Sequence, residues 1–149
     1  MDTHTPASAP ARALDFWLGE WTVTWGDGLS ASNHVEAILG GAVIRESFDG
    51  RPGAEFQGQS LSVYSPALGV WRQTWVDSDG SYWAFTGGPQ GERFVFATDD
   101  VRDGQPIKLR MVFYNLAADR LDWDWERSDD GGATWALKWR LHYTRRPAG

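Results

Sequence analysis

Residues 120–127 read R-L-D-W-D-W-E-R, and residues 134–144 read T-W-A-L-K-W-R-L-H-Y-T. Apolar and polar side chains alternate in both stretches, which is typical of a β-strand with one buried face. In the second stretch the alternation predicts one apolar face, made by Trp135, Leu137, Trp139, Leu141 and Tyr143. Residues 128–133 between them are rich in Asp and Gly and predict a turn. The end of the chain is therefore expected to be a pair of antiparallel strands.

The same period of two extends back to Trp21, with turn signals at the spacing of about 8 to 12 residues that is typical of all-β proteins. About ten strands are predicted, at residues 21–25, 32–39, 43–48, 56–64, 70–77, 81–86, 93–98, 107–115, 120–127 and 134–144. The links are too short for parallel crossovers, and one-sided sheets must close or stack. We therefore predict an all-β, antiparallel up-and-down barrel, with one helical turn within Ala13–Gly19.

The composition fits one domain of 149 residues. We expect a flexible leader at residues 1–13 and a single barrel domain at residues 14–149. Cysteine is absent, which excludes disulfides, thiol nucleophiles and thiolate metal sites. The net charge of −6 disfavours nucleic acids and anionic membranes as partners. The leader lacks the apolar run of a secretory signal and no stretch is long enough for a membrane helix, so we expect a soluble, cytoplasmic protein.

Several blocks of the sequence carry a family resemblance. Residues 15–21, D-F-W-L-G-E-W, contain a Gly-x-Trp motif that resembles the first strand of lipocalin-like, or calycin, barrels. Four further blocks, at residues 33–46, 58–64, 71–77 and 128–135, resemble an uncharacterised bacterial family of small lipocalin-like proteins, a domain of unknown function. The resemblance implies a barrel like that of fatty-acid-binding proteins, plugged at one end by a short N-terminal turn. It implies no reaction.

Residues 128–135 also fit the Asp-box pattern S-x-D-x-G-x-T-W of sialidase propellers. One copy cannot build a propeller. Short carboxylates commonly bind the backbone amides of turns. We therefore predict that Asp130 holds an Asp-box-like hairpin, with a contribution to a glycan site as the alternative.

Two polar residues have the same parity as apolar neighbours, which means that their side chains lie on the same face of the strand. Glu46 lies two residues from Ile44 and from Phe48, and Gln73 lies between two tryptophans in the same way. Both side chains are therefore expected to point into the barrel, unless a bulge near residues 40–41 exchanges the two faces.

A carboxyl group inside the barrel must either find a cation or hold a proton. The candidate cationic partners of Glu46 are Arg45, Arg72 and Arg110. An internal salt bridge that fixes the strand register is one role for Glu46, and a ligand contact is the other. In an enzyme Glu46 would be the general base, with Tyr143 as the acid.

The ten tryptophans are the main anomaly of the composition, since 14% aromatic residues are too many for a soluble surface. A barrel of ten strands leaves room for a small ligand. The expected ligand-binding residues are Trp21, Glu46, Gln73, Trp75, Met111, Phe113, Trp123, Trp125, Trp139 and Tyr143. The favoured function is therefore the binding of a small hydrophobic or aromatic molecule. The alternatives are a homodimer or interaction module whose barrel is filled by side chains, and a lumen-carboxylate enzyme of the isomerase or lyase type.

Histidine is sparse, with His4, His34 and His142 only, and no pair has the spacing of metal ligands. No metal site and no cofactor are expected. One alternative is a haem-binding barrel similar to nitrobindin, which uses a single histidine from a late strand. His142 is the only candidate for that position, although its parity points away from the apolar face.

Overall fold

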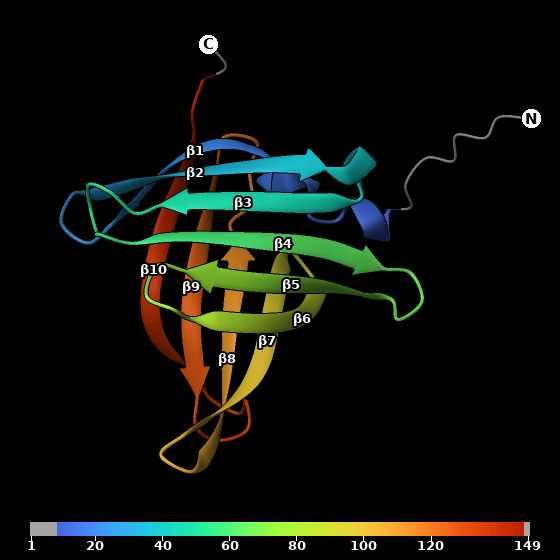
Figure 1. Ribbon diagram of the computed structural model, residues 1–149, viewed down its shortest axis with the longest axis vertical. Coiled ribbons are helices and arrows are strands. Elements are labelled where there is room, and N and C mark those ends of the chain that lie inside the picture. The colour runs from blue at the N-terminus through green and yellow to red at the C-terminus, as the bar shows by residue number, and fades with distance from the viewer. Residues whose placement is uncertain (1–8, 148–149) are drawn as a thin grey trace, which may run out of the picture.

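The computed structural model describes residues 9–147, which fold into a closed antiparallel up-and-down barrel of ten strands (Figure 1). The strands are β1 (Gly19–Trp25), β2 (Leu29–Ile38), β3 (Val43–Asp49), β4 (Gln57–Ser65), β5 (Val70–Asp77), β6 (Tyr82–Gln90), β7 (Arg93–Arg102), β8 (Gln105–Tyr114), β9 (Arg120–Ser128) and β10 (Ala136–Arg145). Each strand pairs with its neighbours in the sequence, and β1 pairs with β10 to close the barrel. The predicted fold class is confirmed.

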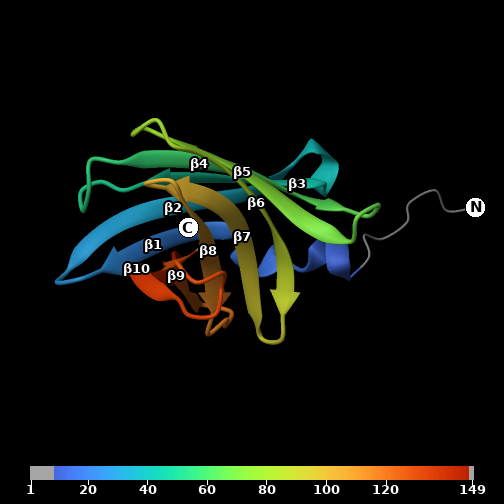
Figure 2. The ribbon, with the colours of Figure 1, turned by 90° about the horizontal axis from the view of Figure 1, so that it is seen from below.

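The barrel has two groups of strands that cross at a steep angle. In Figure 1, β2–β5 run across the view and β7–β10 run down it, and Figure 2 shows the two groups as layers with β6 passing from one to the other. Gly87 lies at the bend of β6, where it pairs with β5 on one side and β7 on the other. A Cβ atom at Gly87 would overlap the carbonyl oxygen of Val95. The link predicted between the strands at residues 81–86 and 93–98 is therefore shorter than expected: the turn lies at residues 91–92, and Gly87 is a strand corner, which glycine permits because it has no side chain.

The apolar face predicted for residues 135–143 is wrong in its first half. The pairing of β10 with β9 shifts register between Leu137 and Trp139. Such a bulge adds one residue to a strand and exchanges the faces of the side chains before it. Leu137 is therefore 46% exposed, while Leu141 and Tyr143 are buried. Trp135 lies outside the barrel, 4.0 Å beneath the guanidinium of Arg110.

In the described part of the chain, three short 3-10 helices accompany the strands: η1 (Pro10–Arg12), η2 (Asp15–Trp17) and η3 (Leu39–Gly41). The helical turn predicted before the first strand corresponds to η2. Within the predicted leader of residues 1–13, η1 contacts the barrel through a 3.0 Å hydrogen bond from Trp71 Nε1 to the carbonyl of Pro10. Residues 1–8 of that leader lie outside the described residues. Within residues 9–147, no helix is long and apolar enough to cross a bilayer.

The N-terminal turns close one end of the barrel. Trp17 is 1% exposed and packs edge to face on Phe113, with ring centroids 5.2 Å apart. Trp21 donates a 2.8 Å hydrogen bond from Nε1 to the carbonyl of Trp17, and the guanidinium of Arg145 lies 4.1 Å over its ring. A Cβ atom at Gly19 would overlap that guanidinium. This end of the barrel is therefore filled by packed side chains.

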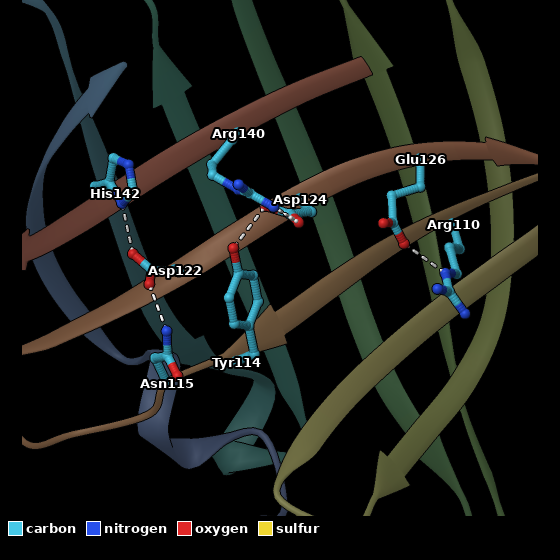
Figure 3. A network of polar contacts seen from close by, with 8 residues as sticks. All are labelled: Arg110, Tyr114, Asn115, Asp122, Asp124, Glu126, Arg140 and His142. Atoms are coloured by element: carbon cyan, nitrogen blue, oxygen red, sulfur yellow. Dashed lines mark hydrogen bonds and ion pairs between the residues drawn. The ribbon is translucent and has the colours of Figure 1, made fainter. Parts of the chain in front are cut away.

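The outer face of β8–β10 carries a ladder of charged contacts (Figure 3). Asp124 accepts hydrogen bonds from Tyr114 Oη and Arg140 Nε, both at 2.9 Å, and its second oxygen binds Arg140 Nη2 at 2.9 Å. A parallel contact joins Arg110 Nε to Glu126 at 2.7 Å. Because these pairs link three adjacent strands, they stabilise the register of the sheet.

The pKa of Tyr114 tests the hydrogen bond between Tyr114 and Asp124 in this ladder. Partial burial and the hydrogen bond to the Asp124 carboxylate raise the pKa of Tyr114 to about 12. In an Asp124→Asn variant, we expect this pKa to fall toward the ordinary tyrosine value of about 10, because the negative charge is removed. Carbon-13 NMR of labelled tyrosine measures it during an alkaline titration. Glu126→Gln is the matched control, and an equal fall in both variants would contradict the contact.

Candidate functional site

The interior of the barrel contains a cavity of about 250 Å³. Its lining combines ten aromatic side chains with a few polar ones: Trp17, Glu46, Phe48, Phe56, Trp75, Asp77, Asp79, Ser81, Trp83, Phe85, Met111, Trp123, Trp125, Trp139, Leu141 and Tyr143. An apolar hollow with a small number of placed polar groups is the usual form of a small-molecule site. This cavity is the candidate functional site.

One wall of the cavity is built around Trp75. This residue lies on β5, paired with Ser60 on β4. Gly58 lies two residues before Ser60, and a Cβ atom there would overlap the Trp75 ring. The missing side chain therefore gives the indole its space. Phe56 stacks on the same indole at 6.2 Å, and Asp77 accepts a 2.8 Å hydrogen bond from its Nε1.

The aromatic lining continues on β9, on its neighbour β10 and on β6, whose Trp83 pairs with Trp75 of β5. Trp123 and Trp125 alternate with polar residues and lie with their rings 6.5 Å apart and nearly parallel, at 4°. Trp83 of β6 lies 6.1 Å from Trp125, and Trp139 of β10 lies 6.2 Å from Trp123. These four indoles are only partly buried against the core. Their remaining surface borders the cavity, so they form an aromatic wall.

The β5–β6 turn contributes the polar rim of the cavity. Asp77 Oδ1 accepts hydrogen bonds from the backbone amides of Asp79 at 3.0 Å and Ser81 at 3.1 Å, and this holds the turn. In Figure 1 the turn lies on the left, at the opposite end from η1 and η2. The cavity therefore reaches the end of the barrel that the N-terminal turns leave uncovered, and the rim there is acidic.

Glu46 lies inside the barrel, as its parity predicts, and is 6% exposed. Its Oε2 accepts a 2.7 Å hydrogen bond from Asn33 Nδ2, and its Oε1 accepts a 2.8 Å hydrogen bond from Ser60 Oγ. The same Asn33 amide donates to Tyr143 Oη at 2.9 Å. Burial raises the pKa of Glu46 to about 7, although the two hydrogen bonds act in the opposite direction.

The expected arginine partners of Glu46 are wrong. Arg45 lies on the other face of β3 and binds Glu36 at 2.9 Å, while Arg110 binds Glu126 outside the barrel. Arg72 is exposed. Since neighbouring residues of a strand point to opposite faces, an arginine beside Glu46 in the sequence cannot reach the lumen. Among the described residues, Glu46 makes its hydrogen bonds to uncharged groups only.

The structure brings seven of the ten predicted ligand residues together around the cavity: Glu46, Trp75, Met111, Trp123, Trp125, Trp139 and Tyr143. The other three point inward but do not line it. Trp21 and Phe113 pack at the closed end. Gln73 is buried, and its Nε2 donates a 2.9 Å hydrogen bond to Ser62 on β4.

Sequence reasoning missed part of the lining. Phe48 shares the parity of Glu46, and Trp83 and Phe85 alternate along a predicted strand, so the signal for these three residues was present. Leu141 also carried a signal, since it belongs to the predicted apolar face of residues 135–143. No comparable signal marks the remaining lining residues, Trp17, Phe56, Asp77, Asp79 and Ser81. Most of them lie in turns, whose position over the lumen depends on how the barrel closes.

The Asp-box-like hairpin makes the predicted turn contacts. Asp130 accepts hydrogen bonds from the backbone amide of Thr134 at 2.9 Å and from its hydroxyl at 2.5 Å. These contacts and the Ser128 hydroxyl lower the pKa of Asp130 to about 2. The Asp130 carboxylate therefore stabilises the hairpin turn, as predicted.

The described histidines lie away from the cavity. His142 is exposed on the outer face, where its Nδ1 lies 2.6 Å from Asp122 Oδ1 (Figure 3). His34 is exposed beside Glu20 and Glu36. His142 therefore offers no ligand to a haem iron in the lumen. His4 lies outside the described residues, and within residues 9–147 no cluster of His, Asp or Glu has the arrangement of a metal site.

Comparison with known proteins adds no relative. No family model matches the chain, and no curated protein matches it either. The relation to small lipocalin-like proteins stays a prediction from the sequence blocks. The cavity and its lining are therefore the features that indicate a function.

Proposed function

We propose that the protein binds a small molecule with an aromatic or apolar body inside the barrel. The observation that carries this proposal is the aromatic cavity of about 250 Å³ that reaches one end of the barrel. An apolar cavity of about 150 Å³ can hold benzene. The available volume therefore suits one ring with a short substituent.

The contrast between the two ends of the barrel supports a binding site over a filled barrel. At the closed end, Trp17, Trp21 and Phe113 have almost no exposed surface. Toward the other end, the wall tryptophans are only partly buried. Large side chains pack the closed end of the lumen, and a hollow of about 250 Å³ remains beside them. Since native cores normally leave few voids larger than a water molecule, a retained hollow favours a ligand.

The surroundings of Tyr143 do not suit its predicted role as a general acid. Burial and the nearby Glu46 raise the pKa of Tyr143 well above its ordinary value. A general acid works best when its pKa lies near the working pH. Tyr143 therefore suits a hydrogen bond to a bound molecule better than proton transfer to it.

Calorimetry with 2-phenylethanol as the probe tests the binding site. We expect saturable binding of one equivalent to the wild-type protein. A Met111→Trp variant fills the cavity from β8, and Ser81→Trp obstructs its rim, so each is expected to weaken binding at least about tenfold.

Leu61→Trp is the matched control, because it adds an indole on the exposed outer face of β4. It is expected to leave binding unchanged. Circular dichroism and thermal unfolding show which variants retain the fold. Equal binding by folded Met111→Trp, Ser81→Trp and Leu61→Trp proteins would contradict a site in the lumen.

A further inference from the structure

We propose that the molecule bound in this cavity is a small organic cation, an amine or quaternary ammonium compound, and that Glu46 is its counter-ion. This inference rests on the proposed function, since it specifies the ligand class of the same site. Three independent features of the lumen support it: the charges of the lining, the contacts of Glu46, and the aromatic walls.

The lining of the cavity carries only negative charge near neutral pH, because carboxyl groups are the only side chains of its described residues that ionise there. Its ionisable carboxyl groups are Glu46, Asp77 and Asp79, and among the described residues that line it there is no Lys, Arg or His. Several basic side chains pair with carboxylates on the outer face, as Arg140 does with Asp124 and Arg110 with Glu126. A bound anion would meet carboxyl groups without a compensating cation, whereas a bound cation would be attracted.

Glu46 is buried without a charged partner. The groups that face it are Asn33 from β2, Ser60 from β4 and Tyr143 from β10, with Asp77 of β5 in the same cavity. Buried charges in proteins are generally paired, because desolvation is costly. An ammonium group in the cavity would supply the missing partner. Because the pKa of Glu46 is about 7, binding near neutral pH would also displace a proton from part of the population.

The walls are suited to a cation. Indole faces attract ammonium and guanidinium groups, and aromatic cages commonly bind quaternary ammonium ligands. The outer and closed parts of this barrel already use this contact, with Arg110 4.0 Å from the Trp135 ring and Arg145 4.1 Å from the Trp21 ring. Inside the cavity, Trp83 lies 5.4 Å from the guanidinium of Arg102, whereas the indoles of Trp75 and Trp123 have no cation among the lining residues.

Trp17 adds a second recognition element. Its side chain lines the cavity and is 1% exposed. Its Nε1 faces the hydroxyl of Tyr143, and among residues 9–147 it makes no hydrogen bond of normal geometry. An indole N–H is a donor only. A hydroxyl, a carbonyl or the face of an aromatic ring on the ligand could accept this hydrogen bond. The expected ligand therefore combines a cationic group with an acceptor or a ring.

Calorimetry with three probes that share one aromatic body tests the charge preference: 2-phenylethylamine, 2-phenylethanol and phenylacetate. At pH 7.5 we expect the amine to bind at least about tenfold more tightly than the alcohol, and phenylacetate to bind most weakly. Measurement in buffers of different ionisation enthalpy is expected to show release of about half a proton per amine bound at pH 7, and none for the alcohol.

Two variants assign the preference to Glu46. Glu46→Gln is expected to remove both the amine preference and the proton release, and wild-type affinity for the amine is expected to rise at least about tenfold from pH 5 to pH 8. Glu20→Gln, which removes one exposed charge outside the barrel, should keep both. Equal binding of the three probes, or tightest binding of phenylacetate, would overturn this inference and leave the proposed function in place. Absence of binding by all three would overturn the proposed function itself.

Discussion

For the Glu46→Gln variant, we expect the free energy of unfolding relative to that of the wild-type protein to increase by about 3 kcal/mol as the pH rises from 4 to 8. Burial raises the pKa of Glu46 from 4.5 to about 7 in the folded state. Between these values the folded protein holds a proton that the unfolded chain has lost, so wild-type stability falls as the pH rises. The destabilisation is absent below about pH 4.5 and complete above about pH 7. Each pKa unit corresponds to about 1.4 kcal/mol.

Urea unfolding of both proteins at several pH values measures this effect. We subtract the free energy of unfolding of the wild type from that of the variant. The contributions of the other titrating groups cancel in this difference. We expect this difference to grow between pH 4.5 and pH 7 and then level off. A Glu20→Gln variant, with its substitution at an exposed site, should show no such growth. A constant difference for Glu46→Gln would contradict the burial of an unpaired carboxyl group.

The Trp17→Ala variant is expected to lose about 3 to 5 kcal/mol of stability. Trp17 is almost completely buried, and its ring packs on Phe113 with centroids 5.2 Å apart. Truncation removes a large apolar surface and leaves a cavity between the N-terminal turns and the barrel. Because the indole also lines the existing cavity, the two spaces would join.

A second tryptophan provides the comparison. Trp135 lies on the outer face beneath Arg110 and is only partly buried, so Trp135→Ala is expected to cost about 1 kcal/mol. Urea unfolding at one pH measures both variants. Similar losses for Trp17→Ala and Trp135→Ala would show that the N-terminal turns do not close the barrel.

Local alternation was enough to predict the architecture but not every face. The period of two in β9 predicts correctly that Trp123 and Trp125 point inward. In β10 the same reasoning fails at Leu137, because the bulge before Trp139 depends on pairing with β9 rather than on local sequence. Gly87 falls outside the predicted strand at residues 81–86 for a similar reason, since its role at a strand corner follows from contacts with two neighbouring strands.

The candidate site could be predicted only in part. Parity alone indicates that Glu46 points inward, but its partners lie elsewhere in the chain. Asn33 and Ser60 reach it from β2 and β4, and their position follows from the register of those strands with β3. A stripe of inward residues also gives no sign of which end is closed. Trp21 and Phe113 were therefore expected at the ligand and lie instead in the packed end.

Indole N–H signals in a proton–nitrogen correlation spectrum report whether the aromatic cavity is a binding site. Each of the ten tryptophans gives one signal. The six that line the cavity are Trp17, Trp75, Trp83, Trp123, Trp125 and Trp139. Titration with 2-phenylethylamine is expected to shift these signals in a saturable way and to leave Trp135, on the outer face, unchanged. Shifts confined to Trp135, or no saturable shift in the six cavity signals, would contradict a binding site in the cavity.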